Sequence, residues 1–185
     1  MLVGDEHVFA IDSHVEELLA SRSLIGIGYF NILLAGTRFG VKDQTATALA
    51  CSYDNIVNRI QMRDQHVTPF PEIQDPHLIA HIFRDVLYVK GEDGTPISGH
   101  ARKGVIDTIY KNKLLFAPDG DEAFADGSYV IHFDVGAEVR LIGFFSGNDE
   151  YYEKGSLVDV RLSADEFYNV LESWRVCFAR EAGIL

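Results

Sequence analysis

Alternation of apolar and polar residues marks the strands of this chain, most clearly between residues 129 and 145. In residues 129–135 every second side chain is apolar, and His132 and Asp134 fall on the other side. A period of two is typical of a strand with one polar face. A second apolar segment, residues 138–145, follows Gly136 and completes a hairpin. Shorter apolar runs predict further strands at residues 8–11, 24–34, 38–41, 114–116 and 157–162.

Apolar residues at helical spacing predict three longer helices. The first starts near Ser52, and the second starts at Asp75-Pro76, where aspartate is a good cap and proline suits the first turn. The third follows Ser163, which forms a capping-box pattern with Glu166. Residues 13–22 are predicted to be a short helix capped by Ser13, and residues 105–110 a short helix or turn.

The order of these elements predicts an α+β fold. Strands come first, then helices, then strands and a final helix, which favours a mostly antiparallel sheet with helices packed on one side. At 185 residues the chain fits a single domain, residues 1–185. Residues 90–104 hold four glycines and a proline without an apolar period, so we expect a flexible surface loop there.

The charge balance narrows the range of partners. The chain has 28 acidic and 16 basic residues, a formal net charge of -12. Such a surface repels nucleic acid and anionic lipid, so we expect neither nucleic acid nor a membrane as a partner, and it attracts basic proteins. Simple solubility is the competing explanation of the charge. No signal peptide or membrane-spanning run is evident, which favours a cytoplasmic protein with reduced thiols. Cys51 and Cys177 have apolar neighbours and are expected to be small core residues.

Two clusters of residues are candidate metal sites. His77 and His81 lie four residues apart on one predicted helix, but no third ligand accompanies them. The acidic loop of residues 119–126 resembles a calcium loop, yet its spacing does not match the EF-hand pattern, and turn formation explains its Asp-Gly pairs. We therefore predict no metal and no cofactor. A metal-binding protein or metal-dependent hydrolase that uses this acidic loop is the alternative.

No catalytic motif emerges from the sequence. There is no G-x-S-x-G nucleophile elbow, and the Gly26-x-Gly28 pair lacks the third glycine and the helix of a dinucleotide fingerprint. The acidic residues fall in an exposed loop rather than in the buried setting that separates the pKa values of a catalytic pair. A non-enzymatic protein is expected.

Two loops that flank the hairpin of residues 129–145 are the candidate binding surface. Both combine carboxylates with aromatic residues; the expected partner-binding residues are Asp119, Asp121, Glu122 and Asp126 in the first loop and Asp149, Glu150, Tyr151 and Tyr152 in the second. Carboxylates speed the approach of a basic partner, and tyrosines supply contact area at low entropic cost. We expect the two loops at opposite ends of the hairpin's outer strand, so they need not form one surface.

Several segments resemble the immunity protein 42 family of bacterial polymorphic toxin systems. The segments that carry the likeness are residues 3–5, 8–11, 28–30, 49–52, 117–124, 126–130, 133–135 and 165–168, with Trp174. The block from Ala117 to Tyr129 is the most specific of them, and the likeness covers most of the chain except residues 90–104.

The resemblance implies a cytoplasmic antidote, typically encoded beside the toxin that it blocks. It implies a non-enzymatic protein that binds and neutralises a cognate protein toxin, and it brings no catalytic residues with it. Many secreted toxins are basic because they act on nucleic acid, so a basic nuclease would suit an acidic partner.

Overall fold

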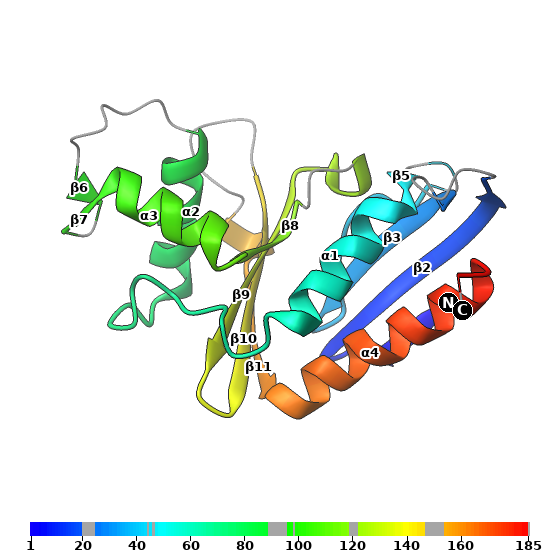
Figure 1. Cartoon of the computed structure of the whole chain (residues 1–185). Helices are drawn as coiled ribbons and strands as arrows, with labels where there is room; N and C mark the ends of the chain where they lie inside the picture. The colour runs from blue at the N-terminus through cyan, green and yellow to red at the C-terminus, as the bar shows by residue number, and fades with distance from the viewer. Residues whose placement is uncertain are drawn as a thin grey trace.

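In the computed structural model, the described residues form two larger antiparallel sheets, one small hairpin and four α-helices, which confirms the α+β class (Figure 1). The described residues are 1–19, 25–43, 45, 47–88, 96–97, 99–118, 122–146 and 154–184. The first sheet has the order β1-β2-β3-β4, and β5 also pairs with β3. Its strands are β1 (Leu2–Asp5), β2 (Phe9–Leu18), β3 (Gly26–Leu34), β4 (Thr37–Phe39) and β5 (Thr47–Ala48).

The second sheet has four strands in the order β11-β10-β9-β8. Its members are β8 (Leu115–Ala117), β9 (Ser128–Val135), β10 (Glu138–Phe145) and β11 (Val158–Ser163). A separate small hairpin joins β6 (Pro96–Ile97) and β7 (His100–Ala101). Part of the loop expected at about 90–104 thus carries regular structure, and its residues 90–95 and 98 lie outside the described residues.

The helices divide between the two sheets. They are α1 (Leu49–Gln61), α2 (Pro76–Tyr88), α3 (Arg102–Lys111) and α4 (Ala164–Glu181). Helices α1 and α4 lie side by side on the first sheet, whereas α2 and α3 cover the second sheet (Figure 1). The single sheet expected from the sequence is therefore split in two, and each half has its own pair of helices.

Both faces of the second sheet are buried. One face packs into the core shared with α4 and the first sheet; its residues are Val130, Val139, Leu141 and Val160. The opposite face packs against α2 and α3; its residues are Ile131, Phe133, Ile142 and Phe144. The period of two predicted for β9 is therefore correct. Its expected polar side is nevertheless buried, and His132 is 0% exposed, because a second layer covers that face.

The two sheets meet where β4 crosses β10. The ring of Phe39 packs on Gly143, where a β-carbon would lie 2.4 Å from the ring. Nearby, the Gly40 amide donates to the hydroxyl of Ser128 at the start of β9, at 2.9 Å. Glycine at position 143 is thus required by the close approach of the sheets.

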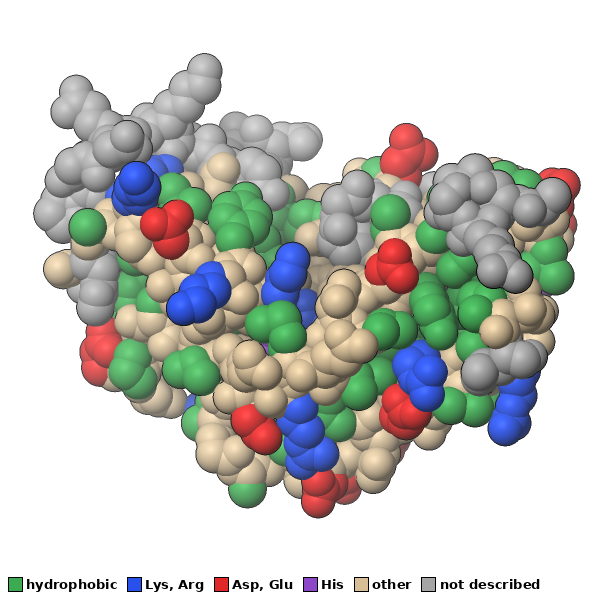
Figure 2. All heavy atoms as spheres, viewed as in Figure 1, with side chains coloured by type: hydrophobic (Ala, Val, Ile, Leu, Met, Phe, Trp, Pro, Cys, Tyr) green, Lys and Arg blue, Asp and Glu red, His purple; other side chains and the backbone are tan. Residues whose placement is uncertain are grey.

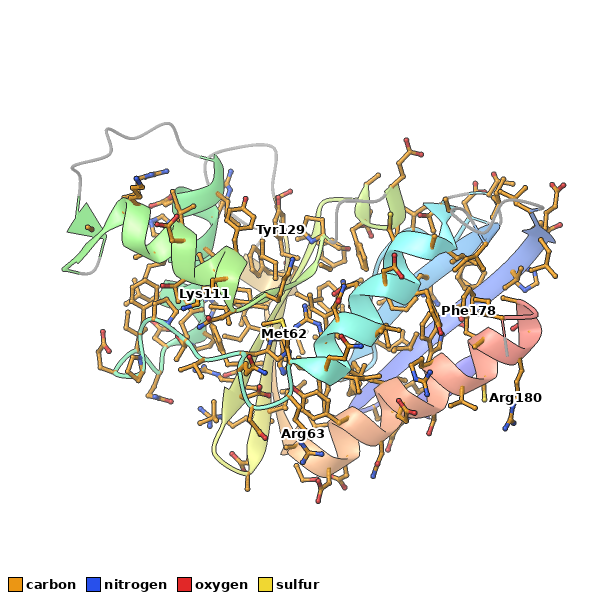
Figure 3. All side chains as sticks on the ribbon, in the orientation of Figure 1. Met62, Arg63, Lys111, Tyr129, Phe178 and Arg180 are labelled. Carbon is orange, nitrogen blue, oxygen red and sulfur yellow. The ribbon has the colours of Figure 1, made fainter. Side chains whose placement is uncertain are left out.

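Helix α4 begins as the sequence predicts. The Ser163 hydroxyl accepts a hydrogen bond from the Glu166 amide, and the Glu166 carboxylate accepts one from the Ser163 amide. Trp174 lies on the buried face of α4 and donates its indole N–H to the Ser13 hydroxyl at 2.9 Å. Figure 3 marks Phe178 further along the helix, where its ring stacks 4.9 Å from that of Trp174.

Two predictions from local sequence are wrong. Ser13 does not cap a helix, because β2 continues to Leu18 and Ser13 is buried in the strand as the acceptor for Trp174. Cys51 and Cys177 are not core residues. Both are exposed, since each lies on the solvent side of its amphipathic helix, α1 or α4, although its sequence neighbours are apolar.

Candidate functional site

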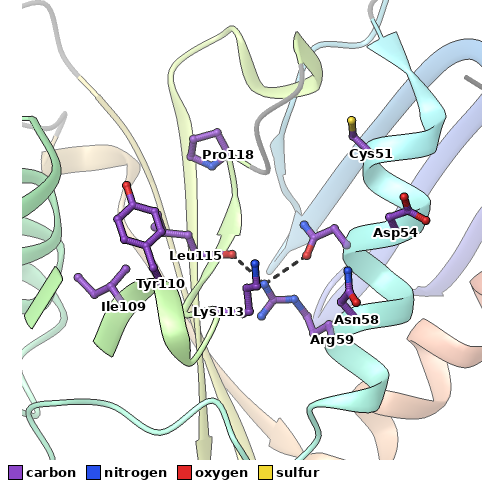
Figure 4. A pocket seen from close by; sticks show the side chains of 10 residues that line it. Cys51, Asp54, Asn58, Arg59, Ile109, Tyr110, Lys113, Leu115 and Pro118 are labelled. Carbon is purple, nitrogen blue, oxygen red and sulfur yellow. Dashed lines mark hydrogen bonds between the residues drawn. The ribbon is translucent and has the colours of Figure 1, made fainter. Parts of the chain in front are cut away.

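A cleft of about 560 Å³ opens between α1 and the α3–β8 segment (Figure 4). In the space-filling view the surface is hollowed between these elements, and basic side chains lie at the hollow (Figure 2). The lining residues are Cys51, Asp54, Asn55, Asn58 and Arg59 from α1, and Ile109, Tyr110, Lys113, Leu115 and Pro118 from α3, β8 and their flanks.

The two walls differ in chemistry. The α1 wall is polar. Its lining residues are spaced three or four apart and so share one helix face: Cys51, Asp54, Asn55 and Asn58. On the opposite wall Tyr110 is 60% exposed at the rim, whereas Ile109 is buried. Lys113 follows α3 with a positive φ of 50°, a left-handed residue that ends the helix and turns the chain towards β8.

Arg59 lines the cleft with a side chain that is only 1% exposed. Its Nη2 atom donates to the Leu115 carbonyl at 2.8 Å and approaches Asn55 Oδ1 at 3.5 Å (Figure 4). Its Nη1 atom lies 2.6 Å from His132 Nδ1, and the guanidinium lies 4.4 Å from the centre of the Phe116 ring. Arg59 thereby joins α1 to both β8 and β9 at the base of the cleft.

The contact with Arg59 determines the state of His132. Arginine can only donate hydrogen bonds, so His132 Nδ1 must accept, and the ring is neutral with its proton on Nε2. That Nε2 atom faces Asp134 Oδ1 at 3.2 Å. Burial first, and then the positive charge of Arg59, lower the pKa of His132 to about 3 despite the opposing effect of Asp134.

The Asp134 carboxylate accepts hydrogen bonds from two further groups of this buried cluster. Its Oδ1 accepts the Tyr168 hydroxyl at 2.9 Å, and its Oδ2 accepts the His66 amide at 3.1 Å. Burial opposes ionisation, but the nearby His132 ring first, and then the hydrogen bonds from His66 and Tyr168, lower the pKa of Asp134 to about 2. Burial and the Asp134 carboxylate raise the pKa of Tyr168.

His66 completes the cluster from the connector between α1 and α2. Its ring lies 4.3 Å from that of His132, and its Nδ1 atom lies 2.8 Å from the Asn112 carbonyl. Burial and the charge of Arg59 lower the pKa of His66. The cluster is closed off from solvent, and Arg59 is its member that reaches the cleft.

Most of the predicted partner-binding residues lie outside the described part of the chain. These are Asp119, Asp121, Asp149, Glu150, Tyr151 and Tyr152. Glu122 is exposed in the short 3-10 helix Glu122–Phe124. Asp126 is exposed too, but its carboxylate accepts the Gly40 amide at 3.2 Å and the Ser128 amide at 3.0 Å. Asp126 therefore has a structural role beside any role in binding.

The two candidate loops leave the hairpin at the same end. Ser128, the first residue of β9, pairs with Phe145, the last residue of β10. The Ser146 amide donates to the Gly127 carbonyl at 2.8 Å, so the bases of the loops touch. The expectation of opposite ends is wrong, because antiparallel pairing brings the two flanks of a hairpin together.

The candidate metal ligands form no metal-binding centre within the described chain. His81 Nε2 lies 3.3 Å from Asp85 Oδ2. Among the described residues, no group of three or more histidine, cysteine, aspartate or glutamate side chains is arranged to hold a metal ion. In the same part of the chain, no helix is long and apolar enough to cross a membrane.

Comparison with known proteins connects this architecture to one family. The family model described as immunity protein 42 matches residues 1–176. The chain belongs to the immunity protein 42 family. The match confirms the resemblance seen in the sequence and covers the cleft, the buried cluster and both candidate loops, so an immunity role is the role that membership supports.

A solved structure shares the fold of this immunity protein 42 member. CdiI from Burkholderia dolosa AUO158 aligns over 94% of this chain and 97% of its own, with a TM-score of 0.59 and 16% sequence identity. At that identity the likeness shows the common fold alone. No curated protein sequence matches this chain.

The cleft is not evident in the sequence. Its walls come from segments that are about fifty residues apart, and no local motif connects them. The one available signal was Arg59, an arginine on the apolar-rich helix α1. Helical spacing puts Arg59 on the polar face of α1, with Asn55 and Asn58, whereas the tertiary structure buries it.

Proposed function

We propose that this protein is a non-enzymatic immunity protein that binds and neutralises a cognate toxin. Family membership over residues 1–176 is the observation that carries the proposal. The net charge of -12 supports a basic toxin, and a nuclease is the basic class that such a surface suits best.

The acidic loops at one end of the β9–β10 hairpin are the proposed first contact. Glu122 and Asp126 belong to the described part of this end, and the other proposed residues are Asp119, Asp121, Asp149, Glu150, Tyr151 and Tyr152. Because the bases of both loops are hydrogen-bonded together, carboxylates of the two loops act on one approaching partner. Electrostatic attraction of this kind raises association rates above the roughly 10⁵–10⁶ M⁻¹s⁻¹ of neutral pairs.

Binding to a neighbouring gene product tests the proposal. The probe is the purified toxic domain of the toxin-like protein encoded beside this gene, titrated into the immunity protein in a calorimeter. Saturable binding is expected, and it should weaken as salt is added, because screening removes the charge attraction. Absence of binding to any toxin domain encoded next to the gene would overturn the proposal.

A further inference from the structure

The cleft between α1 and α3 differs in charge from the rest of the molecule. The chain carries a net charge of -12, yet Arg59 and Lys113 line the cleft against one carboxylate, Asp54. Arg59 is held rigidly at the base by Leu115 and His132, and Lys113 stands exposed at the rim. The buried Arg59 guanidinium adds positive charge at the cleft, and the exposed Lys113 ammonium can donate hydrogen bonds to a carboxylate that enters it.

The rim carries the features of a protein-binding site. Tyr110 is 60% exposed, and exposed tyrosines are typical anchors of protein interfaces. Within the described residues, neither the Tyr110 hydroxyl nor the Lys113 ammonium group makes a hydrogen bond or ion pair. On the facing wall, Asn58 presents an exposed amide that can pair with the backbone of an extended segment. The neighbouring Asn55 amide already donates to the Phe116 carbonyl at 3.0 Å.

We propose that this cleft receives a protruding segment of the cognate toxin, with an acidic side chain of that segment between Arg59 and Lys113. The proposal rests on the proposed function and names its anchoring site. A volume of about 560 Å³ is that of a pocket for a drug-sized molecule, so it holds a few residues of a loop and not a folded surface. The acidic loops attract the toxin, and the cleft then fixes its orientation.

Two native cysteines allow the site to be probed without mutation. Cys51 lines the cleft on α1, whereas Cys177 is exposed on α4 and is not a lining residue (Figure 4). The rate at which iodoacetamide alkylates each thiol is measured by mass spectrometry, for the free protein and for its complex with the adjacent-gene toxin domain. Alkylation of Cys51 should slow by about tenfold or more in the complex, because a packed interface excludes solvent. Alkylation of Cys177 should not change.

Two lysine-to-glutamate variants, one in the cleft and one outside it, test the role of Lys113. Lys113→Glu should raise Kd about tenfold or more, because it places a carboxylate against the incoming acidic group. The control is Lys103→Glu, an exposed lysine on the first turn of the same helix that does not line the cleft. It makes the same change in net charge and should leave Kd within about twofold. Equal thermal midpoints for the two variants would show that both are folded.

The outcomes separate the two proposals. If the toxin domain binds but Cys51 reacts as fast in the complex as in the free protein, the cleft is not the docking site and the immunity role stands. Equal weakening by Lys113→Glu and Lys103→Glu would also overturn the cleft, since it would reflect net charge alone. If no toxin domain binds at all, the proposed function fails and this proposal fails with it.

Discussion

At the scale of single residues, Arg59 connects parts of the chain that are distant in sequence. Its bonds to the Leu115 carbonyl and the His132 ring span 56 and 73 residues. Both partners are buried or partly buried acceptors, and Arg59 is the residue of α1 that donates to them. A buried acceptor without a donor costs about 1–3 kcal/mol, and bonds to a charged group are the stronger ones. Arg59 therefore stabilises the junction of the two sheets.

We predict that Arg59→Met lowers the free energy of unfolding by about 2–4 kcal/mol, because methionine fills most of the space but donates nothing. Urea unfolding followed by tryptophan fluorescence measures the change, since Trp174 is buried. Arg38→Met is the control at an exposed arginine of β4 and should stay within about 0.5 kcal/mol. A loss for Arg59→Met no larger than the control would contradict the structural role.

The two buried histidines predict an acid-sensitive fold. The pKa of His132 is about 3 in the folded protein against an ordinary value of 6.5, and the pKa of His66 is also lowered. The unfolded chain takes up protons that the folded chain cannot, so their stabilising contribution is complete above about pH 6.5 and declines as the pH falls towards 3. Asp134 adds a separate loss of stability only as the pH falls from its ordinary pKa of 3.8 to its folded pKa of about 2.

The expected slope below pH 6.5 is up to about 1.4 kcal/mol per pH unit for each buried histidine. Urea unfolding from pH 7.5 to pH 4.5 measures it, and His132→Gln should remove the share that His132 contributes. His7→Gln is the control, because the His7 side chain is 81% exposed. A stability that does not change between pH 6.5 and 4.5 would show that these histidines are not held neutral.

At the scale of elements, the clearest local signals are those whose partners lie within four residues. The capping box at Ser163 and the Asp75-Pro76 start of α2 have such partners, and both are confirmed. Ser13 fails for the opposite reason. Its sequence suits a helix cap, but its decisive partner is Trp174, 161 residues away. Tertiary contacts of that range override local preference.

The capping box gives a quantitative test at this scale. Ser163→Ala should lower the free energy of unfolding by about 1 kcal/mol, because the Glu166 amide loses its acceptor. Ser173→Ala, at an exposed position within α4, should be neutral or slightly stabilising since alanine favours helix. Thermal unfolding of both variants measures the difference, and equal midpoints would contradict the cap.

At the scale of the whole molecule, the family could be recognised from sequence but the site could not. The likeness of residues 117–130 to immunity protein 42 lies in one continuous stretch, so it can be read directly from the sequence. The cleft depends on how α1 and α3 are placed by two different sheets, which no local pattern encodes. The shared end of the two loops was within reach, because antiparallel pairing alone requires it.

Charge reversal in the acidic loop tests how the whole molecule attracts its partner. Replacing Asp121 and Glu122 with lysine should slow association with the toxin domain and flatten its salt dependence, because long-range attraction acts mainly on the association rate. Stopped-flow mixing at two salt concentrations measures both effects. Asp126 is left unchanged because its carboxylate holds the Gly40 and Ser128 amides. Unchanged association would remove this loop from the interface.

Protection of living cells tests the immunity role most directly. The toxin domain encoded beside this gene is expressed in a susceptible bacterium, with and without this protein, and surviving colonies are counted. We predict that co-expression restores survival against this toxin and not against an unrelated toxin of the same activity. Equal killing with and without the protein, when both proteins are shown to accumulate, would contradict it.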